Sequence, residues 1–493
     1  MTKEICIVGS GICGMCTAIS LAPSGHTITL LERDAPPPDG DADQAFFEWI
    51  RLGAVQFRHP HAFLGLMCNL IRDNYPDLMQ EFFNAGARPV WFSEMLTPQM
   101  KAKYKPQPDD EKLWVLLCRR ATIETVLRRY VERLANVTIV NQTTVTGLMA
   151  EVVDSQVVVN GVHTRKDGAA MTKRADLIID ASGRGSKFPR WFADLGVPIR
   201  EEKEDAQIVY YTKHFKLKPG QAEPPRGERP AAGDLGYLKF GVFPGDNGHF
   251  SVILCLPSDE EDLKAAVRDT DKFDQICSQI PGVAQWTNPD RAEATTRPFG
   301  IADIAAVWRH YVEDGKPKTV NFFAVGDASM RTNPLYGRGC STGVMHAQIL
   351  AQIVDSDMAA NDQALAFDVQ TLDQLRPIYD ASLREDKNGI RRWTQMKEAG
   401  QDAAPDNFKK RFGAAFGDAI SAASRRHLFV VRGIMKTFHL IEKPGDFLKD
   451  WRIRTIVLLY MLRGRKRNAA SRLQPGPKRD ELYTQLGLLE PSQ

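Results

Sequence analysis

Three glycines near the N-terminus have the spacing of a phosphate-binding turn. Gly9, Gly11 and Gly14 form a G-x-G-x-x-G pattern after one apolar run, and Glu32 follows the next apolar run. The first glycine permits a tight turn, the second lets the backbone approach a pyrophosphate, and the third lets a helix pack closely on a strand. A carboxylate at the position of Glu32 can accept hydrogen bonds from ribose hydroxyls. These residues predict a dinucleotide site.

A second group of residues suited to chemistry lies far downstream. Asp327 follows a buried-strand run, and Pro334, Gly337 and Gly339 open a helical pattern. Such a carboxylate can bind the ribityl hydroxyls of a flavin, with Pro334 along the ring. Backbone N–H groups near the two glycines would face N1 and O2 of the flavin ring, where negative charge gathers when the flavin is reduced. The alternative is an ordinary strand–turn–helix connection.

A third strand-end carboxylate is Asp180, which is followed by Gly183. Upstream, Arg120 stands between an apolar stretch and an amphipathic helical pattern that together cover residues 116–128. An arginine in that place can contact a phosphate or ribityl group, or it can be a solvated charge at a helix end.

Apolar runs in the sequence predict the strands and helices that carry these residues. Residues 4–8 and 27–31 predict parallel strands, with a helix over 12–21 between them. Residues 137–146 predict a further strand, and a helix is expected over 342–354. Strand, glycine turn, helix, strand and acid in this order are typical of a Rossmann-like α/β unit.

Taken together, these motifs resemble those of the FAD-dependent monooxygenases of the para-hydroxybenzoate-hydroxylase fold. The three elements occur in that family's order and approximate spacing over about residues 1–375. Residues 53–61, 180–191 and 476–482 are most similar to the bacterial branch that contains the polyether and polyene epoxidases. One departure is Ala54-Val55, where that branch usually has Val-Pro, so the loop beside the flavin can differ in shape.

The resemblance implies FAD as the cofactor. Arg33 would flank the adenine, Arg51 would reach the pyrophosphate, and Val145 would lie by the adenine through its backbone. The residues that the resemblance and the motifs assign to FAD are Gly9, Gly11, Gly14, Glu32, Arg33, Arg51, Gln56, Arg120, Val145, Asp180, Gly183, Asp327, Pro334, Gly337 and Gly339.

The resemblance also implies a reaction. In the family, NADPH or NADH reduces the flavin, O₂ adds at C4a, and the hydroperoxide passes one oxygen to the substrate. We therefore expect epoxidation or hydroxylation of a hydrophobic alkene, terpenoid or polyketide-like molecule. His59 and His61 lie in the loop expected near the flavin and are the candidate catalytic residues. The alternative, which the residues favour, is that both histidines only hydrogen-bond within the loop. No second glycine motif remains for a nicotinamide, so reduction would use a transient site or a partner flavin reductase.

Length and pattern predict a discontinuous domain organisation. At 493 residues the chain is too long for one core. The FAD-binding domain is expected over residues 1–75, 108–190 and 300–375, and a substrate domain with an antiparallel sheet over 76–107 and 191–299. The remainder, residues 376–493, predicts helices.

Composition narrows the class of protein. The net charge of +3 gives no reason to expect a nucleic-acid partner, and the histidines and cysteines lack the spacing of metal ligands. The eight cysteines are scattered in apolar surroundings, as in a cytoplasmic protein, and Cys13 and Cys16 are interpreted as packing residues rather than a redox pair. We find neither a signal peptide nor a membrane-spanning run in this sequence.

Residues 425–467 hold twelve Lys or Arg against three acids, interleaved with apolar residues. This segment predicts either a helical cap on the substrate domain or a peripheral contact with an anionic membrane surface.

Three other functions remain open at this point. An isoprenoid reductase of the geranylgeranyl-reductase type would share the nucleotide elements. A flavin-dependent halogenase is less favoured, because the Trp-x-Trp-x-Ile-Pro motif of that family is absent. A carrier without activity, like the proteins that bind prenylated GTPases, would have lost the flavin contacts that Glu32 and Asp327 predict.

Overall fold

The computed structural model describes residues 2–227, 229–400, 407–469 and 475–489. At its centre lies a five-stranded parallel sheet in the order β21 (Phe322–Ala324), β9 (Leu177–Asp180), β1 (Glu4–Val8), β2 (Thr27–Leu31) and β5 (Val137–Val140). All four neighbouring strand pairs run parallel, so the carboxyl ends of β1, β2, β9 and β21 meet at one edge. The first βαβ unit confirms the sequence prediction to the residue, with α1 over Ile12–Leu21.

The two faces of the parallel sheet are covered differently. Ile5 and Ile7 of β1 pack in a core with the helices α1, α3 (Gly65–Asn74), α4 (Pro76–Asn84), α6 (Arg120–Glu132) and α11 (Gly339–Val354). Cys6 and Val8 face the opposite core, which the sheet of β20 (Thr319–Val320), β7 (Gln156–Lys166), β6 (Thr143–Val153) and β8 (Ala169–Arg174) closes together with α7 (Phe188–Asp194). Helix α4, which falls in the segment 76–107 that the sequence predicts for the substrate domain, packs its Leu78, Met79 and Phe82 in the first core.

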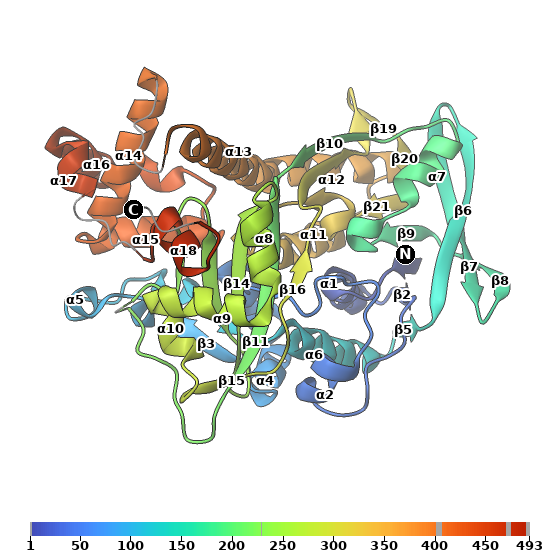
Figure 1. Ribbon diagram of the computed structural model, residues 1–493. Coiled ribbons are helices and arrows are strands. Elements are labelled where there is room, and N and C mark those ends of the chain that lie inside the picture. Colours follow the sequence, from blue (N-terminus) through green and yellow to red (C-terminus); the bar gives the residue numbers. More distant parts are fainter. Residues whose placement is uncertain (1, 228, 401–406, 470–474, 490–493) are drawn as a thin grey trace.

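A second, antiparallel sheet forms the body of the other half of the molecule (Figure 1). Its order is β12 (Ala232–Asp234), β13 (Lys239–Pro244), β14 (His249–Pro257), β11 (Ile208–Leu217) and β15 (Ala292–Ala294), and β16 (Phe299–Ile301) also pairs with β11. One face carries Val209, Tyr211 and Phe215 into a core with α8 (Glu261–Arg268), α9 (Thr270–Gln279) and α10 (Pro281–Thr287). Side chains alternate between the faces of a strand, so Tyr210 and Thr212 point the other way, toward the loops that carry Asn333 and His59.

Smaller elements join these parts. The remaining strands are β3 (Arg88–Trp91), β4 (Trp114–Leu117), β10 (Arg200–Asp205), β17 (Ala305–His310), β18 (Val312–Glu313), β19 (Lys316–Pro317) and β22 (Met330–Arg331). The remaining helices before residue 376 are α2 (Ala42–Glu48), α5 (Pro98–Lys101), α12 (Ala360–Gln374) and the short helices η1 (Ala22–Ser24), η2 (Phe92–Glu94), η3 (Asp110–Lys112), η4 (Gly183–Gly185), η5 (Gly326–Ala328) and η6 (Pro334–Tyr336).

The C-terminal part is helical, as the sequence predicts. It contains α13 (Arg376–Ala399), α14 (Phe408–Ser424), α15 (Leu428–Phe438), η7 (Asp446–Lys449), α16 (Trp451–Arg463), α17 (Arg465–Ala469) and α18 (Arg479–Gln485). Helices α14 to α17 lie at one end of the molecule and the β6–β8 sheet lies at the opposite end (Figure 1). Parallel sheet, antiparallel sheet and C-terminal helices confirm the expected fold class.

Two predicted boundaries were wrong. The strand expected over 137–146 is two strands, because Gln142 turns the chain with a φ of +55° between β5 and β6. The helix expected from residue 342 begins at Gly339, because the backbone after the left-handed Gly337 is already helical. Glycine has a low helix propensity, so the sequence around Gly337 and Gly339 did not indicate the first turn of α11.

Candidate functional site

The three N-terminal glycines occupy three different environments. Gly9 has a φ of +104°, and a Cβ there would lie 2.6 Å from the carbonyl oxygen of Ala181. A Cβ on Gly14 would lie 2.0 Å from the carbonyl oxygen of Gly9. At Gly11 a Cβ would meet no heavy atom within 4 Å. Gly9 and Gly14 are thus required by close packing, while Gly11 borders open space in front of the N-terminus of α1, where an anion is favoured.

Glu32 lies at the end of β2 and closes the same loop. Its Oε2 accepts hydrogen bonds from Ser10 N at 3.0 Å and Ser10 Oγ at 2.7 Å, and its Oε1 accepts one from Asp34 N at 2.9 Å. Burial by itself raises the pKa of Glu32, but Arg51 and these hydrogen bonds outweigh it and hold the pKa below its ordinary value. The side chain is therefore a buried carboxylate with acceptor capacity left on Oε1.

Arg51 lies among three carboxylates. Its guanidinium is 3.3 Å from Glu32, 3.1 Å from Asp34 and 3.1 Å from Glu124. Burial alone lowers the pKa of Arg51, but the three acids outweigh this and raise it. Arg51 thus joins the end of β2 to α6 beside the loop of Gly9 to Gly14.

Arg120 opens α6 and is also buried. Its Nε donates to Glu124, and its NH1 donates to Nε2 of His61 at 3.0 Å. Together with Arg51, it makes Glu124 the centre of a buried charge cluster that the sequence patterns did not indicate, since an acid inside an amphipathic helix usually faces solvent.

The other residues assigned to FAD are less closely grouped. Asp180 is fully buried, and its carboxylate accepts hydrogen bonds from Ser182 and Ser186 in the loop that follows it. The same loop contains Gly183, which has a positive φ. Arg33 is half-exposed and donates to the carbonyl of Leu52.

Two further assigned residues have placements that bear on the same prediction. Val145 is buried in β6 on the face of the parallel sheet that α1 does not cover. The carbonyl of Gln56 accepts a hydrogen bond from His59 N at 3.0 Å inside its loop. The roles of these residues stay predictions.

Asp327 differs from Asp180, although both follow strands of the parallel sheet. Its carboxylate has no hydrogen bond or ion pair within the part of the chain that the structure describes. Burial raises its pKa above the ordinary value, and Arg331 and Arg120 oppose that rise. A Cβ on Gly339 would lie 4.0 Å from Asp327 Oδ1, so this carboxylate faces the start of α11. A strand-end carboxylate without a protein partner is suited to a hydroxylated ligand.

The loop before α11 lies against the loop that holds the two histidines. Gly337 has a φ of +65°, and a Cβ there would be 2.9 Å from Cβ of Ala62. Pro334 and Gly339 are exposed on either side of it. The loops predicted to border the flavin are therefore neighbours in space.

Both histidines are engaged in hydrogen bonds. Nδ1 of His59 lies 2.8 Å from Thr212 Oγ1, and burial lowers the pKa of His59 to about 4. Nδ1 of His61 lies 2.8 Å from the carbonyl of His59, and burial together with Arg120 lowers the pKa of His61 to about 3. Both rings are neutral near pH 7 and connect the loop to β11 and to α6.

The two cysteines of the C-x-x-C pattern pack inside the fold. Cys13 Sγ lies 3.4 Å from the carbonyl of Gly343 on α11, and burial raises the pKa of Cys16 to about 12. All eight cysteines are free. This placement agrees with the interpretation of Cys13 and Cys16 as packing residues.

A network that sequence reasoning missed lies beside Pro334. Tyr210 of β11 donates to Oδ1 of Asn333, and Asn333 Nδ2 donates to Oδ1 of Asp386 at 2.6 Å. Tyr336 donates to the same Oδ1 at 2.7 Å. Burial raises the pKa of Asp386, and its buried Oδ2 has no partner among the described residues. In the sequence, Asp386 is one acid among many polar residues of a predicted helix, and such acids are common, so nothing marked it as a site residue.

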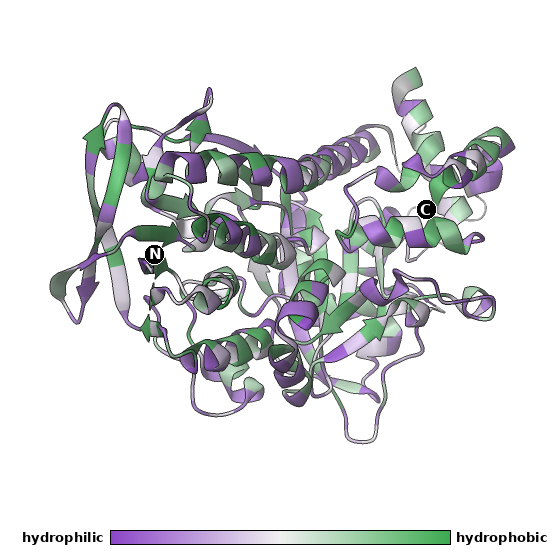
Figure 2. Cartoon of the chain, turned by 180° about the vertical axis from the view of Figure 1, so that it is seen from behind, coloured by the Kyte–Doolittle hydropathy of each residue, from purple (hydrophilic) through white to green (hydrophobic). Residues whose placement is uncertain are grey.

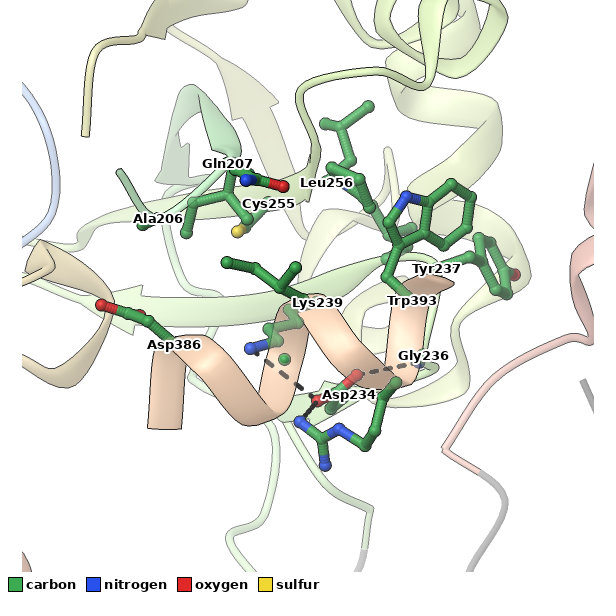
Figure 3. A pocket seen from close by; sticks show the side chains of 16 residues that line it. Ala206, Gln207, Asp234, Gly236, Tyr237, Lys239, Cys255, Leu256, Asp386 and Trp393 are labelled. Carbon is green, nitrogen blue, oxygen red and sulfur yellow. Dashed lines mark hydrogen bonds and ion pairs between the residues drawn. The ribbon is translucent and has the colours of Figure 1, made fainter. Parts of the chain in front are cut away.

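Asp386 lines a partly open pocket between α13 and the antiparallel sheet. Figure 3 shows the residues that line it, among them Asp386 and Trp393 on α13 and Lys239, Cys255 and Leu256 on the sheet. At the exposed end Arg392 donates to Asp234 at 2.9 Å. The apolar residues of the lining include Ile208, Leu238, Leu256, Pro257, Ile390 and Trp393. The cavity is thus largely apolar, and Asp386, whose Oδ2 has no partner among the described residues, forms part of its wall.

Among the described residues there is neither a cluster of metal ligands nor a helix suited to cross a membrane. In the described ranges, no three His, Cys, Asp or Glu side chains come together as they would around a metal ion. Among the helices of the same ranges, none combines the length and apolar character needed to cross a membrane.

Comparisons with known proteins agree with this geometry. The model of the family described as "FAD binding domain" matches residues 2–363. Protein Rv3254 of Mycobacterium tuberculosis is 26% identical over 389 residues, which cover 73% of this chain and 74% of that protein.

Two solved structures have a similar fold. One is p-nitrophenol 4-monooxygenase PnpA from Pseudomonas putida, with 16% identity, a TM-score of 0.57 and coverage of 90% of this chain and 99% of that one. The other is the flavin-dependent brominase Bmp2, with 14% identity, a TM-score of 0.58 and coverage of 94% and 100%. At these identities the similarity concerns the fold.

Proposed function

Because this chain belongs to the FAD binding domain family of oxidoreductases, we propose that it is a monooxygenase that epoxidises or hydroxylates a hydrophobic substrate. The substrate class we favour is an alkene of terpenoid or polyketide-like character. NADPH or NADH would supply the electrons, directly or through a partner reductase. Support comes from the apolar cavity next to the predicted flavin loop.

The residues present fit FAD at both ends of the cofactor. The open backbone at Gly11 and the N-terminus of α1 would hold the pyrophosphate, and Glu32 the adenosine ribose. The unpartnered Asp327 would bind the ribityl hydroxyls, and the backbone around Gly337 and Gly339 would face the ring. When bound, FAD supplies the redox chemistry: it accepts electrons from the nicotinamide and activates O₂.

The protein's own contribution is to place the substrate and to exclude water. Apolar side chains of the sheet and of α13 line the cavity and would expel water from a bound alkene. His59 and His61 are neutral and hydrogen-bonded, so in this reading they hold the loop beside Ala62 in place. A direct proton-transfer role for either histidine would require it to leave its present partner.

One observation carries the proposal: the cavity and the predicted flavin site share a hydrogen-bond network. Asp386 lines the cavity, and its Oδ1 accepts from Asn333 and Tyr336, the residues on either side of Pro334 and Leu335. A substrate in the cavity would lie next to the loop that faces the flavin ring.

The test begins with the absorbance spectrum of purified protein, which should show bound flavin. NADH or NADPH is then added without oxygen, followed by O₂ and a panel of terpenoid alkenes. We expect substrate-dependent O₂ consumption with one atom of ¹⁸O₂ incorporated into the product. Reduction of the alkene with hydrogen from the nicotinamide and without O₂ uptake would favour the reductase alternative, and protein that cannot be loaded with FAD would contradict the proposal.

A further inference from the structure

Helix α16 is apolar on both of its faces. Its inner face places Ile453 and Val457 in a core with Ala419, Ala423 and Val430 of α14 and α15. Its outer face exposes Trp451, Thr455, Leu458, Leu459 and Leu462, which fall on one side of a helix with about 3.6 residues per turn. A surface helix normally has a polar outer face. The exposed row of large apolar side chains therefore indicates a face that contacts something other than water.

The exposure of this outer face is substantial. Trp451 is 68% and Leu462 85% exposed, and Leu458 and Leu459 are each more than half exposed. Figure 2 shows apolar segments on these helices at the outer edge of the molecule. A contiguous exposed apolar surface of this kind marks an interaction site.

Basic residues border the apolar row on both sides. Arg452 and Arg463 fall on one flank of α16 and Arg454 on the other, and α17 continues with exposed Arg465, Lys466 and Arg467. Residues 451–467 contain six Lys or Arg and no acid. Two of the six form ion pairs, Arg452 with Asp450 and Arg465 with Asp418. Positive charge is thus concentrated around the apolar row.

This combination favours a lipid surface over a second copy of the chain. A two-fold interface would bring the same arginines of two copies together, and like charges would repel. An anionic bilayer accepts both features: apolar side chains enter the acyl boundary, tryptophan lies at the headgroup level, and Lys and Arg contact the lipid phosphates. We propose that the outer face of α16 docks this protein on an anionic membrane surface.

The helices that carry this face are fixed to the rest of the molecule. Arg432 of α15 is buried and donates to both carboxylate oxygens of Asp110, at 2.8 and 3.0 Å. Lys436 adds an ion pair with Asp109 at 2.9 Å. Leu428 and Val431 of α15 pack against Phe92 and Leu96. The outer face of α16 is therefore presented by a well-anchored element, and docking requires no unfolding.

The test uses the full chain loaded with FAD and sedimented with vesicles. Vesicles of phosphatidylcholine with about one third phosphatidylserine should bind the protein, and pure phosphatidylcholine vesicles should bind it at least about tenfold more weakly. Raising the salt to about 0.5 M should release it, because screening weakens surface electrostatics. Leu462→Glu should abolish sedimentation, and Arg454→Glu should weaken it by about 30-fold.

The matched control is Val369→Glu on α12, which also replaces a well-exposed apolar helix residue and should bind as the wild type does. All variants should keep their flavin, because the substituted side chains lie on the surface. Failure of the wild type to bind phosphatidylserine vesicles, or full binding by Leu462→Glu, would overturn the proposal. A salt-resistant dimer that Leu462→Glu dissociates would assign the face to a second copy instead.

Discussion

Asn333 Nδ2 donates a 2.6 Å hydrogen bond to Oδ1 of Asp386 and thereby ties the loop before α11 to helix α13. The two residues are 53 positions apart in the chain, yet both are buried. This bond joins the wall of the cavity to the segment that is predicted to face the flavin. It makes α13, which lies beyond the matched family region, a structural part of the site.

The first prediction concerns Asp386. Asp386→Leu leaves the buried donors of Asn333 and Tyr336 without an acceptor, which costs about 2 to 4 kcal/mol of unfolding free energy. Asp386→Asn keeps an acceptor oxygen and should cost less than about 1.5 kcal/mol. Urea unfolding of the FAD-loaded protein measures both. Asp380→Leu is the control, because it removes only a surface ion pair on the same helix; equal losses in Asp386→Leu and the control would contradict the role of Asp386.

The second prediction separates two glycines of one motif. Gly11→Val should fold normally, because a Cβ there meets no protein atom, but it should lose most of its FAD because the side chain fills the space in front of α1. Gly14→Val should fold poorly, since even its Cβ would lie 2.0 Å from the carbonyl of Gly9. Circular dichroism reports the fold and flavin absorbance reports the cofactor. A fully yellow Gly11→Val protein would place the pyrophosphate elsewhere.

The sequence patterns predicted the parts of the fold that depend on local signals. The first βαβ unit and an antiparallel sheet in the second half of the substrate domain follow from apolar runs and turn residues, which act over a few positions. The two strand-end acids Asp180 and Asp327 were found equally easily. Asp180 accepts hydrogen bonds from Ser182 and Ser186, whereas Asp327 has no partner among the described residues. This difference depends on the conformation of the two loops, so the sequence pattern did not indicate it.

Contacts between residues far apart in the chain could not be predicted from the sequence patterns. The pairing of Asp386 with Asn333, and of Arg120 with His61, requires the tertiary structure to bring separate elements together. Side-chain type alone did not mark Asp386, because acids are common on the solvated faces of helices. The basic charge of residues 425–467 was evident, but the exposed apolar side of α16 became apparent only once its inner face was located.

The third prediction contrasts the two strand-end acids. Asp327→Ala should weaken FAD binding by about 10- to 100-fold, because a charged acceptor for the cofactor hydroxyls is lost. The unfolding free energy without FAD should stay constant or rise, since this carboxylate is desolvated and has no protein partner. Asp180→Ala should instead destabilise the protein itself, because it removes the acceptor of Ser182 and Ser186. Fluorescence titration with FAD and urea unfolding distinguish the two effects; tight FAD binding by Asp327→Ala would contradict its assigned role.

The fourth prediction is a loss of stability in weak acid. Burial lowers the pKa of His214 and of His346 from 6.5 to about 3, so both rings are neutral in the folded protein. The unfolded chain takes up these protons below about pH 6.5, and the folded state cannot do so until about pH 3. Stability from each histidine is therefore complete above pH 6.5 and is lost as the pH falls, by up to about 2 kcal/mol each between pH 7 and pH 5.

His346→Gln tests this directly, because a glutamine oxygen can still accept the hydrogen bond from Gly326 N. Its unfolding free energy should decrease by about 2 kcal/mol less than that of the wild type between pH 7 and pH 5. His163→Gln, at an exposed position on β7, should follow the wild-type curve. If His346→Gln also follows the wild type, the buried ring of His346 is not the group that binds the proton on unfolding, and the acid sensitivity must come from other residues.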